Sequence, residues 1–248
     1  MIALVVSRDP VARGVAKILG LDAAPGAAAF SLARRGEIAA VIHNGDSTEV
    51  PPEDELRRLG IDHLVVPSRH EMARPRPMLT VHTSGTAPSL SVAYAGLKSW
   101  LFRRICLERP EGYDCEIEAT HHEPNTEHLS VTFVEVGSTE REWSDERALR
   151  TLASALEDLT DFKPSGAPVV MSVGDLHYSL LKQEVLNGVD IGHVIHKDVA
   201  DVDLTLRALS KHVEAPRVVV IYKKSLKGAV RRGVLDALRE RGVELDVR

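Results

Sequence analysis

Short apolar runs alternate along the chain with longer stretches in which apolar residues recur at helical spacing. The first run, Ile2–Val6, predicts a buried strand. A helix is predicted over Pro10–Leu19, because Asp9 can act as its N-cap and proline suits the first helical position. The same alternation predicts seven further strands, at Ile38–Ile42, His63–Val66, Met78–Thr83, Leu129–Val136, Pro168–Val173, Arg217–Tyr222 and Val243–Val247. It also predicts helices at Glu53–Leu59 and Leu90–Leu107, a helix that begins at Ser144 and a last helix that begins at Ser225.

This repeated strand-then-helix order is typical of an α/β protein. We expect a mixed or largely parallel central sheet flanked by helices, with Ile2–Val6, Met78–Thr83 and Leu129–Val136 among its strands. The segment SRHEMARPRPML, which begins at Ser68, is rich in arginine and proline and is expected to be loosely structured. No linker or repeat divides the chain, so we interpret residues 1–248 as a single domain with room for two lobes.

The composition is that of an ordinary globular protein. The chain has 248 residues, of which 44% are hydrophobic and 27% charged, so it can bury a sizeable core. Aromatic residues make up only 4%, which leaves Val, Leu, Ile and Ala to fill that core. The apolar runs are too short to cross a bilayer and no basic leader precedes the first of them, which predicts a cytoplasmic protein with no membrane partner.

Charge and cysteine content narrow the classes further. A net charge of -5 argues against binding of long duplexes by overall charge, so any nucleic-acid contact needs a local basic patch. Cys106 and Cys115 provide no disulfide framework and no CxxC motif, and each is interpreted as a small buried hydrophobic residue. His43, His63 and His212 stand apart from other functional groups and are interpreted as structural or exposed.

One segment carries an unusual number of functional groups. The stretch CEIEATHHEPNTEHLSVTFVEVGSTEREW, from Cys115 to Trp143, contains three of the 11 histidines and seven glutamates. Glu135 shares a strand face with apolar residues, and a buried carboxylate there needs a partner or a raised pKa. His121 and His122 lie at a strand-to-loop transition, where both rings can converge on one site.

Several of these side chains are adequate ligands for zinc, which accepts imidazole and carboxylate. His82 ends a strand, and ligands of α/β sheets collect at such ends. The spacing is irregular, unlike that of HExxH or CxxC motifs, so the alternative is that these histidines hydrogen-bond loops or contact a substrate directly. The candidate ligand set is His82, His121, His122, His177, Glu135 and Glu140.

Three further segments suggest substrate contacts. Tyr178 follows a glycine turn after a predicted strand, and His193 follows Gly192, where a ligand can approach the backbone closely. The run YKKSLKGAVRR places cations at the start of the last helix, whose free N–H groups attract anions. The alternative for this run is a solvated face. Its cations are Lys223, Lys224, Lys227, Arg231 and Arg232.

Taken in order, several motifs resemble those of the archaeal and plant-type (type 2) D-aminoacyl-tRNA deacylase family. They are SRHEM, LTVHTSGT, EATHHEP, VEVGSTEREW, GDLHY, IGHVI and KKSLKG, and they run from Ser68 to Gly228. The chain differs from the family pattern in three loops: HTSGT replaces HTPGN, THHEP replaces THHGP, and GDLHYSL replaces a loop similar to GGxHYAP. The differing residues include Ser84, Glu123 and Asp175.

The resemblance implies that the chain hydrolyses the ester bond of D-aminoacyl-tRNA, which is then its partner. It also implies zinc as cofactor, with two ions per chain, and we expect the chain to be a monomer. A bound metal would lower the pKa of a water molecule and polarise the ester carbonyl. A metal-free site would use a histidine as general base and backbone N–H groups for the oxyanion. The expected catalytic residues are His82, His121, His122 and Glu135, the expected metal ligands are His82, His121, His122, His177 and Glu140, and the expected substrate-binding residues are Tyr178, His193, Lys223, Lys224 and Lys227.

Two other functions stay open at the level of sequence. One is a metal-dependent amidohydrolase or peptidase that acts on a small substrate and needs no basic patch near its histidines. The other is a non-catalytic RNA-binding relative whose loops have changed. The chain has no GxSxG, GxGxxG or Walker A motif, which argues against an elbow-type serine hydrolase, a dinucleotide enzyme and a P-loop NTPase.

Overall fold

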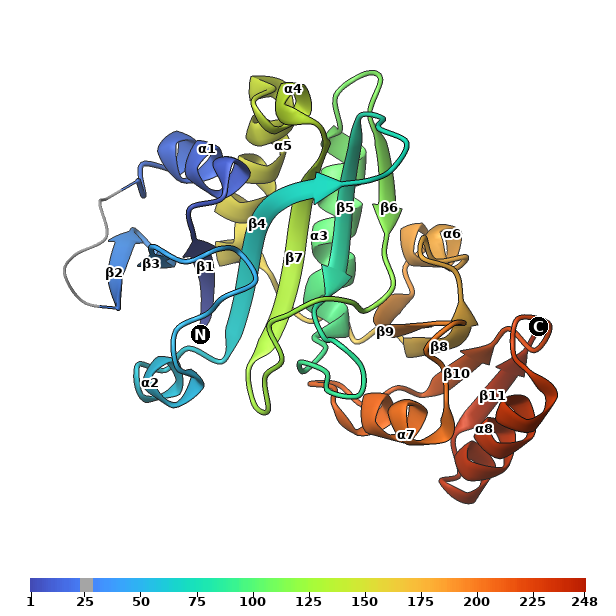
Figure 1. The fold of residues 1–248 in the computed structure, drawn as a ribbon. Coiled ribbons are helices and arrows are strands. Elements are labelled where there is room, and N and C mark those ends of the chain that lie inside the picture. Colours follow the sequence, from blue (N-terminus) through green and yellow to red (C-terminus); the bar gives the residue numbers. More distant parts are fainter. Residues whose placement is uncertain (23–28) are drawn as a thin grey trace.

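The computed structural model describes residues 1–22 and 29–248 and shows an α/β fold with two sheets (Figure 1). The larger sheet has seven strands, and their pairing is parallel except for the β2–β3 and β5–β7 pairs. Their order is β2 (Phe30–Arg35), β3 (Ile38–His43), β1 (Ile2–Val6), β4 (His63–Glu71), β7 (Ser130–Ser138), β5 (Met78–Thr83) and β6 (Asp114–Ile117). The mixed central sheet is therefore confirmed, and it contains all three strands that the sequence assigned to it.

The smaller sheet has four strands, all paired in parallel. Their order is β11 (Glu244–Val247), β10 (Val218–Ile221), β8 (Val169–Asp175) and β9 (Asp190–His196). In Figure 1 this sheet lies at the lower right, and α7 (Val202–Ser210) and α8 (Gly228–Glu240) pack beside it. Between β8 and β9 the chain forms the short helix α6 (Lys182–Leu186).

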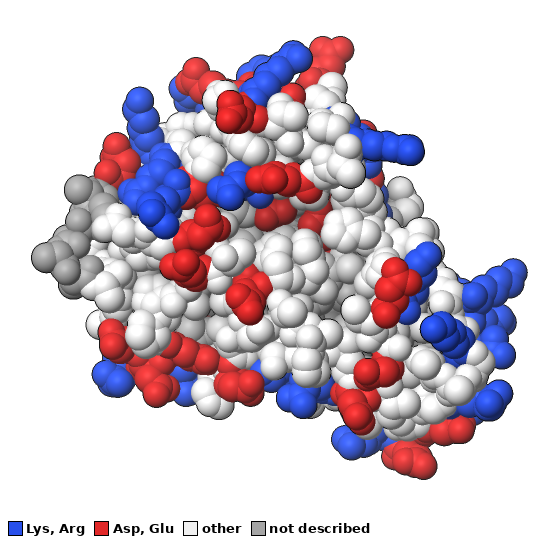
Figure 2. All heavy atoms as spheres, in the orientation of Figure 1, with Lys and Arg blue, Asp and Glu red and all other residues white. Residues whose placement is uncertain are grey.

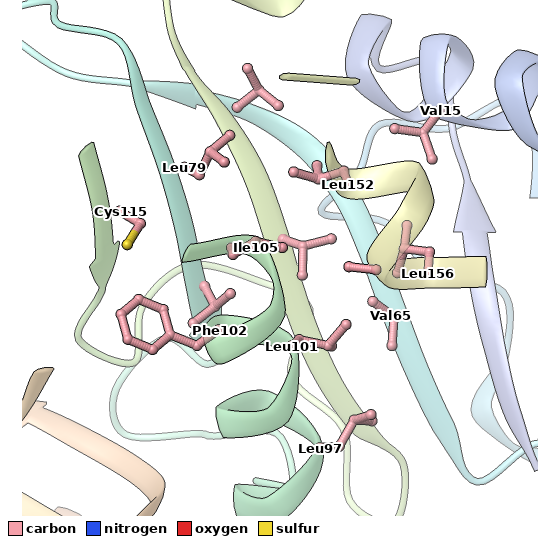
Figure 3. Packing of buried hydrophobic residues seen from close by; sticks show 14 of the residues in the cluster. Val15, Val65, Leu79, Leu97, Leu101, Phe102, Ile105, Cys115, Leu152 and Leu156 are labelled. Carbon is pink, nitrogen blue, oxygen red and sulfur yellow. The ribbon is translucent and has the colours of Figure 1, made fainter. Parts of the chain in front are cut away.

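One hydrophobic cluster joins the two sheets. The helices α1 (Pro10–Leu19), α3 (Ala95–Glu108) and α5 (Glu146–Glu157) cover one face of the larger sheet. Figure 3 shows Leu101 and Ile105 of α3 beside Leu152 and Leu156 of α5, over the strands. The same cluster includes Val194 of β9, so α3 packs against the smaller sheet as well. The opposite face of the larger sheet carries a second cluster, closed at one end by α2 (Glu53–Arg58).

The start of α1 follows directly from the sequence. The carboxylate of Asp9 accepts hydrogen bonds from the backbone N–H of Val11 at 2.9 Å and of Ala12 at 3.4 Å, and Pro10 takes the first helical position. The helix ends at Gly20, whose φ of 65° is a conformation that glycine adopts without strain. The predicted bounds of this helix are confirmed.

Some elements differ from the sequence prediction. β4 continues through Glu71 instead of loosening at Ser68, because each of its nine residues pairs with β7. α3 begins at Ala95 rather than Leu90, since the residues before it form isolated bridges with other segments. α5 follows the short helix α4 (Glu140–Trp143) and is capped by Asp145 rather than Ser144. α8 begins three residues after Ser225, and β2, β6, β9, α6 and α7 were not predicted.

The two cysteines form a disulfide, contrary to the expectation of two separate buried thiols. Cys106 lies near the end of α3 and Cys115 lies in β6, with their Cα atoms 5.7 Å apart. Both side chains are buried, so the expected burial is confirmed and only the free state was wrong. Sequence spacing missed the bond because α3 and β6 become neighbours only through the packing of the helix on the sheet.

Within the part of the chain that the structure describes, no helix has the length and apolar content needed to cross a membrane.

Replacing Cys106 and Cys115 together by serine should lower the free energy of unfolding by roughly 2–3 kcal/mol, since the bond restricts the unfolded chain. Urea titrations of the oxidised protein and of the variant measure this difference. The wild type unfolded in a reductant is the matched control and should behave like the variant. Two reactive thiols in denatured protein prepared without reductant would contradict the bond.

Candidate active site

A polar cluster lies on the face of the larger sheet that points away from α3. Side chains alternate along a strand, so that Leu79 and Val81 of β5 face α3 while His82 faces the other side. On β7 the same alternation brings Glu135 and Phe133 to that side, and the His82 ring stacks on Phe133 at 4.9 Å. The cluster opens into a cleft of about 350 Å³, which is lined by His70, His121, His122, Glu135 and His177, together with Arg69 and Asp46.

Four histidine rings meet in this cluster. The ring centroid of His82 lies 4.2 Å from that of His121 and 4.7 Å from that of His122. The centroids of His121 and His122 are 4.5 Å apart, and His177 lies 5.1 Å from His121. The four rings therefore converge, although they come from β5, from the segment after β6 and from the loop after β8.

The hydrogen bonds of His122 determine where the protons of two rings lie. Nδ1 of His122 is 2.7 Å from the carbonyl oxygen of Glu123, which can only accept, so this nitrogen carries the proton. Nε2 of His122 then has no proton, and its lone pair faces Nε2 of His82 at 3.0 Å. His82 must donate in this contact, which leaves a lone pair on its Nδ1. His122 holds this position with a φ of 40°, a strained value for a residue with a side chain.

A third lone pair comes from His121. Its Nδ1 lies 2.7 Å from the carbonyl oxygen of Ala119 and so carries the proton, which leaves a lone pair on Nε2. This Nε2 is 3.5 Å from Oε2 of Glu118, and His82 Nδ1 is 3.4 Å from the same oxygen. Among the described residues, neither His82 Nδ1 nor either oxygen of Glu118 has a hydrogen-bond partner. Two ring nitrogens with lone pairs, one buried and one half-buried, therefore face the same oxygen of Glu118, while Nδ1 of His70 lies 3.0 Å from the other oxygen. The facing lone pairs call for a cation or an added proton at Oε2 of Glu118.

Burial decides the charge of these groups. It lowers the pKa of His82 well below the ordinary histidine value and lowers that of His121 to about 4, so both rings are neutral. Burial and then the nearby charge of Glu135 raise the pKa of Glu118 well above its ordinary value. The buried carboxyl group of Glu118 therefore binds a proton or a cation rather than remaining as an unpaired charge.

Glu135 has the partners that its buried position requires. Its oxygens accept hydrogen bonds from the hydroxyl groups of Ser68 at 2.6 Å and Thr80 at 3.2 Å, and lie 3.3 Å from Nδ1 of His70. Burial by itself would raise its pKa, but the hydrogen bonds from His70 and Ser68 and the neighbouring histidines together lower it. Glu135 therefore stays ionised and fixes the imidazole of His70.

His70 in turn fixes Tyr178. Nε2 of His70 lies 3.2 Å from the phenol oxygen of Tyr178, and the guanidinium of Arg76 lies over the tyrosine ring at 5.8 Å. Burial raises the pKa of Tyr178 to about 12, so the phenol keeps its proton at neutral pH. Nδ1 of His70 thus faces Glu135 while its Nε2 faces the phenol of Tyr178, whose hydroxyl also lies 3.9 Å from the sulfur of Met72.

Glu118 and His70 were missed by the sequence analysis. Glu118 follows β6 and donates its backbone N–H to Val81, which places it beside His82 on the neighbouring strand. The signal was present, because two polar residues end adjacent strands, but it required the β5–β6 pairing to be known. His70 was missed because its segment was expected to be loosely structured rather than part of β4.

Glu140 and His193, which were expected at the site, lie apart from the histidine cluster. Glu140 is exposed at the first position of α4, and no candidate metal group among the described residues includes it. His193 is fully buried, with Nδ1 3.1 Å from the Thr120 hydroxyl and Nε2 3.1 Å from the Lys211 carbonyl oxygen, so it offers no surface to a substrate. His212 does not stand apart as expected, since its Nε2 accepts a hydrogen bond from the backbone of His193.

The loop that carries His177 and Tyr178 is held by the buried carboxylate of Asp175. Its Oδ1 accepts from the backbone N–H of Leu176 at 2.8 Å and of Leu180 at 3.1 Å. Its Oδ2 accepts from the hydroxyl groups of two serines, each at 2.8 Å. The far side of the loop pairs with the segment after β6: Ala119 N–H bonds to the carbonyl of His177, and Ser179 N–H to that of Ile117. An aspartate at this position thus gives the loop a fixed shape.

The other two differing residues are also placed by the structure. Ser84 is buried, and its hydroxyl donates to that of Ser91, which donates to the carbonyl of Pro124. Glu123 is exposed, and its carbonyl accepts the hydrogen bond that orients His122. Both changes are compatible with the observed geometry of the cluster.

The expected basic run lies at the ends of the smaller sheet's strands. Lys223 and Lys224 follow β10 directly, and Lys227 occupies the position before the first turn of α8. β10 pairs in parallel with β8, which leads into the loop of His177, so the run and the loop follow the same ends of neighbouring strands. Figure 2 shows Lys and Arg side chains over the surface where α8 and β11 lie in Figure 1.

Known proteins are similar to this chain over its whole length, in sequence and in fold. A model of the D-aminoacyl-tRNA deacylase family matches residues 58–246. The chain is 39% identical over 251 residues to a D-aminoacyl-tRNA deacylase of Pyrobaculum aerophilum, with 100% of both chains covered. It is 34% identical over 206 residues to the protein of that name in Caldivirga maquilingensis, covering 75% of this chain and 76% of the relative. The crystal structure of a conserved protein of unknown function, AF0625, has the same fold, with a TM-score of 0.88 at 24% identity over 100% of this chain and 95% of that one.

Replacing Asp175 by alanine should lower the free energy of unfolding by about 2–4 kcal/mol, because two N–H groups and two hydroxyl groups lose their acceptor. Asp175→Asn is the matched control. Its amide oxygen still accepts from Leu176 and Leu180, and its amide group can donate to the serine hydroxyls, so the loss should be smaller. Denaturant titration gives both values. Faster amide exchange confined to the loop in Asp175→Ala would support the assignment, whereas equal stability of all three proteins would contradict it.

Proposed function

Because the chain belongs to the D-aminoacyl-tRNA deacylase family, we propose that it hydrolyses the ester bond of D-aminoacyl-tRNA and releases free D-amino acid and tRNA. The observation that carries this proposal is the convergence of four histidine rings and two buried glutamates in one cluster that opens into the cleft. These groups suit hydrolysis by an activated water. A tRNA substrate would place the protein in the cytoplasm.

We propose zinc as the cofactor of this cluster. The fit is chemical, since neutral imidazole nitrogens and carboxylate oxygens are zinc ligands, and two imidazole nitrogens with lone pairs face one oxygen of Glu118. His82, His121, His122, His177 and Glu118 all belong to candidate ligand groups. When bound, zinc would supply Lewis-acid polarisation of the ester carbonyl and a water of lowered pKa.

The protein's own residues have separable tasks in this proposal. His177, exposed at the cleft, accepts the proton of the attacking water, because its ring faces both His121 and solvent. Glu135 and His70 hold Tyr178, whose oxygen can accept a hydrogen bond from the substrate. His122 orients His82 through the contact between their Nε2 atoms.

Contacts with the tRNA are proposed for two basic surfaces. Arg69 lines the cleft itself and is held by Asp9 at 3.1 Å and Glu71 at 3.0 Å. The basic run at Lys223, Lys224 and Lys227 follows the strand next to the one that delivers His177. A hydrolase for small substrates needs no such neighbourhood, so this placement favours a nucleic-acid substrate.

His121→Ala and His122→Ala should each slow hydrolysis of D-Tyr-tRNA by about 10²-fold or more, because one removes a half-buried lone pair of the cluster and the other releases His82. L-Tyr-tRNA at matched concentration should be hydrolysed much more slowly than the D-ester by the wild type. The measurement is release of labelled amino acid, with and without added zinc.

The control for these variants is His128→Ala, since His128 is exposed and lies outside the cluster. It should match the wild type. Affinity for uncharged tRNA should change little in any of the three, because phosphate contacts supply most of it. Hydrolysis of the D-ester at the background rate by the wild type, with and without zinc, would overturn the proposed function.

Charge reversal at Lys224 and Lys227 should weaken tRNA binding and reduce the dependence of log K on log salt by roughly one unit per lost phosphate contact. The double variant Lys17→Glu with Lys163→Glu, at two exposed sites outside the basic run, is the matched control, because it changes the net charge by the same amount. Filter binding at several salt concentrations gives both the affinity and the slope. If the double variant and the control have equal slopes, the basic run is only a solvated face.

A further inference from the structure

Thr120, the residue before His121, anchors the histidine segment to the smaller sheet. Its backbone N–H donates to the carbonyl of Val194 in β9 at 2.8 Å. Its hydroxyl accepts from the backbone N–H of Val194 at 3.3 Å and lies 3.1 Å from Nδ1 of His193. Three contacts of one residue therefore join the segment after β6 to β9.

The hydrogen bonds of His193 define which of its nitrogens carries the proton. Nε2 lies 3.1 Å from the carbonyl oxygen of Lys211, which can only accept, so Nε2 is protonated. Burial lowers the pKa of His193 well below the ordinary histidine value, so the ring is neutral and Nδ1 has a lone pair. The hydroxyl of Thr120 then donates to Nδ1 while it accepts from the backbone of Val194.

Lys211 holds the other end of the same segment. Its Nζ donates to the carbonyl of Thr126 at 2.9 Å and to that of Leu90 at 2.8 Å. Thr126 lies four residues after His122, and Leu90 lies in the stretch that follows β5. The backbone carbonyl of this lysine is the one that accepts from His193, so the two anchors of the histidine segment meet at one imidazole.

The imidazole of His193 belongs to a tightly held part of β9. The backbone N–H of His193 donates to Nε2 of His212 at 3.1 Å, and Lys98, which is fully buried, donates to the carbonyl of Gly192. A Cβ at position 192 would lie 2.0 Å from Nε2 of His212. Gly192 therefore makes room for this histidine side chain and not for a ligand, as the sequence had suggested.

We propose that His193 is a positioning residue of the hydrolytic site, an assignment that rests on the proposed function. It joins the anchor before His121, at Thr120, to the anchor after His122, at Lys211. His193 touches no substrate, because it is fully buried. It acts through the place of the two rings, and a displacement of a reacting group by about 1 Å can slow a reaction by about 10²-fold.

Thr120→Val removes the hydroxyl with little change in shape and leaves Nδ1 of His193 without its donor. We expect kcat for D-Tyr-tRNA to fall by about 10–100-fold and KM to change by less than about 3-fold, because the rings move while the substrate contacts remain. Thr120→Ser keeps the hydroxyl and should return kcat to within about 3-fold of the wild type. Circular dichroism at the assay temperature verifies that each variant is folded.

Thr205→Val is the matched control. Thr205 is also buried, and its hydroxyl donates to the carbonyl of Asp201 at the start of α7. Its loss should lower the melting temperature and leave kcat unchanged. A folded Thr120→Val with kcat within about 3-fold of the wild type would overturn the proposal, as would an equal fall of kcat in Thr205→Val.

His193→Gln tests the link between the two anchors. The amide nitrogen can still donate to the carbonyl of Lys211, but no acceptor remains where Nδ1 lies. Combined with Thr120→Val, it should lower kcat to within about 2-fold of the value for the more impaired single variant, because both changes break the same hydrogen bond. Independent effects that multiply would contradict the link.

Amide hydrogen exchange of the free protein separates this inference from the proposed function. Residues 119–126 should exchange at least ~10-fold faster in Thr120→Val than in the wild type, and at the wild-type rate in Thr205→Val. If this difference is found but the wild type leaves D-aminoacyl-tRNA intact, the anchor stands and the proposed function fails. An active wild type with unchanged exchange in Thr120→Val would contradict the positioning role alone.

Discussion

The buried charge of Glu135 is the constraint on which the site depends. An ionised carboxylate with 3% of its surface exposed is tolerated only where donors surround it. Those donors come from both neighbours of β7: Ser68 and His70 from β4, and Thr80 from β5. The register of three strands and the extension of β4 through His70 are therefore tied to one acid. Glu135 orients the ring of His70, and His70 in turn contacts the phenol of Tyr178.

Both sheets supply residues to the histidine cluster. His82, His121, His122 and Glu118 come from the larger sheet and the segment after it, whereas His177 arrives on the loop after β8. α3 is packed against strands of both sheets, so the two halves of the cleft are held by a common core. The family resemblance thus corresponds to a physical unit: the matched residues 58–246 span the strands of both sheets that deliver the cluster.

The sequence predicted what local pattern controls. Asp9 with Pro10 defined the start of α1, and apolar alternation placed β1 and β5 at their observed bounds. It did not reveal β6 or β9, which are short or polar and owe their conformation to their partners in the sheets. The same reason hid Glu118 and His70, because their burial follows from pairing across the sheet rather than from neighbours in sequence. The convergence of His82 with His121 and His122 was expected, but Glu140 and His193 were named without knowledge of depth or distance.

The loop held by Asp175 has a second consequence, for solubility. β6 is the last strand of the larger sheet, and an uncovered strand edge offers its backbone to other molecules and invites aggregation. The pairing of Ala119 and Ser179 with the opposite segment covers part of this edge with the very loop that brings His177 to the cleft. A change that loosened this loop to admit other substrates would also uncover the edge. Changes in substrate range at this loop are thus coupled to the risk of self-association. The anchoring of the loop both positions His177 and covers the strand edge.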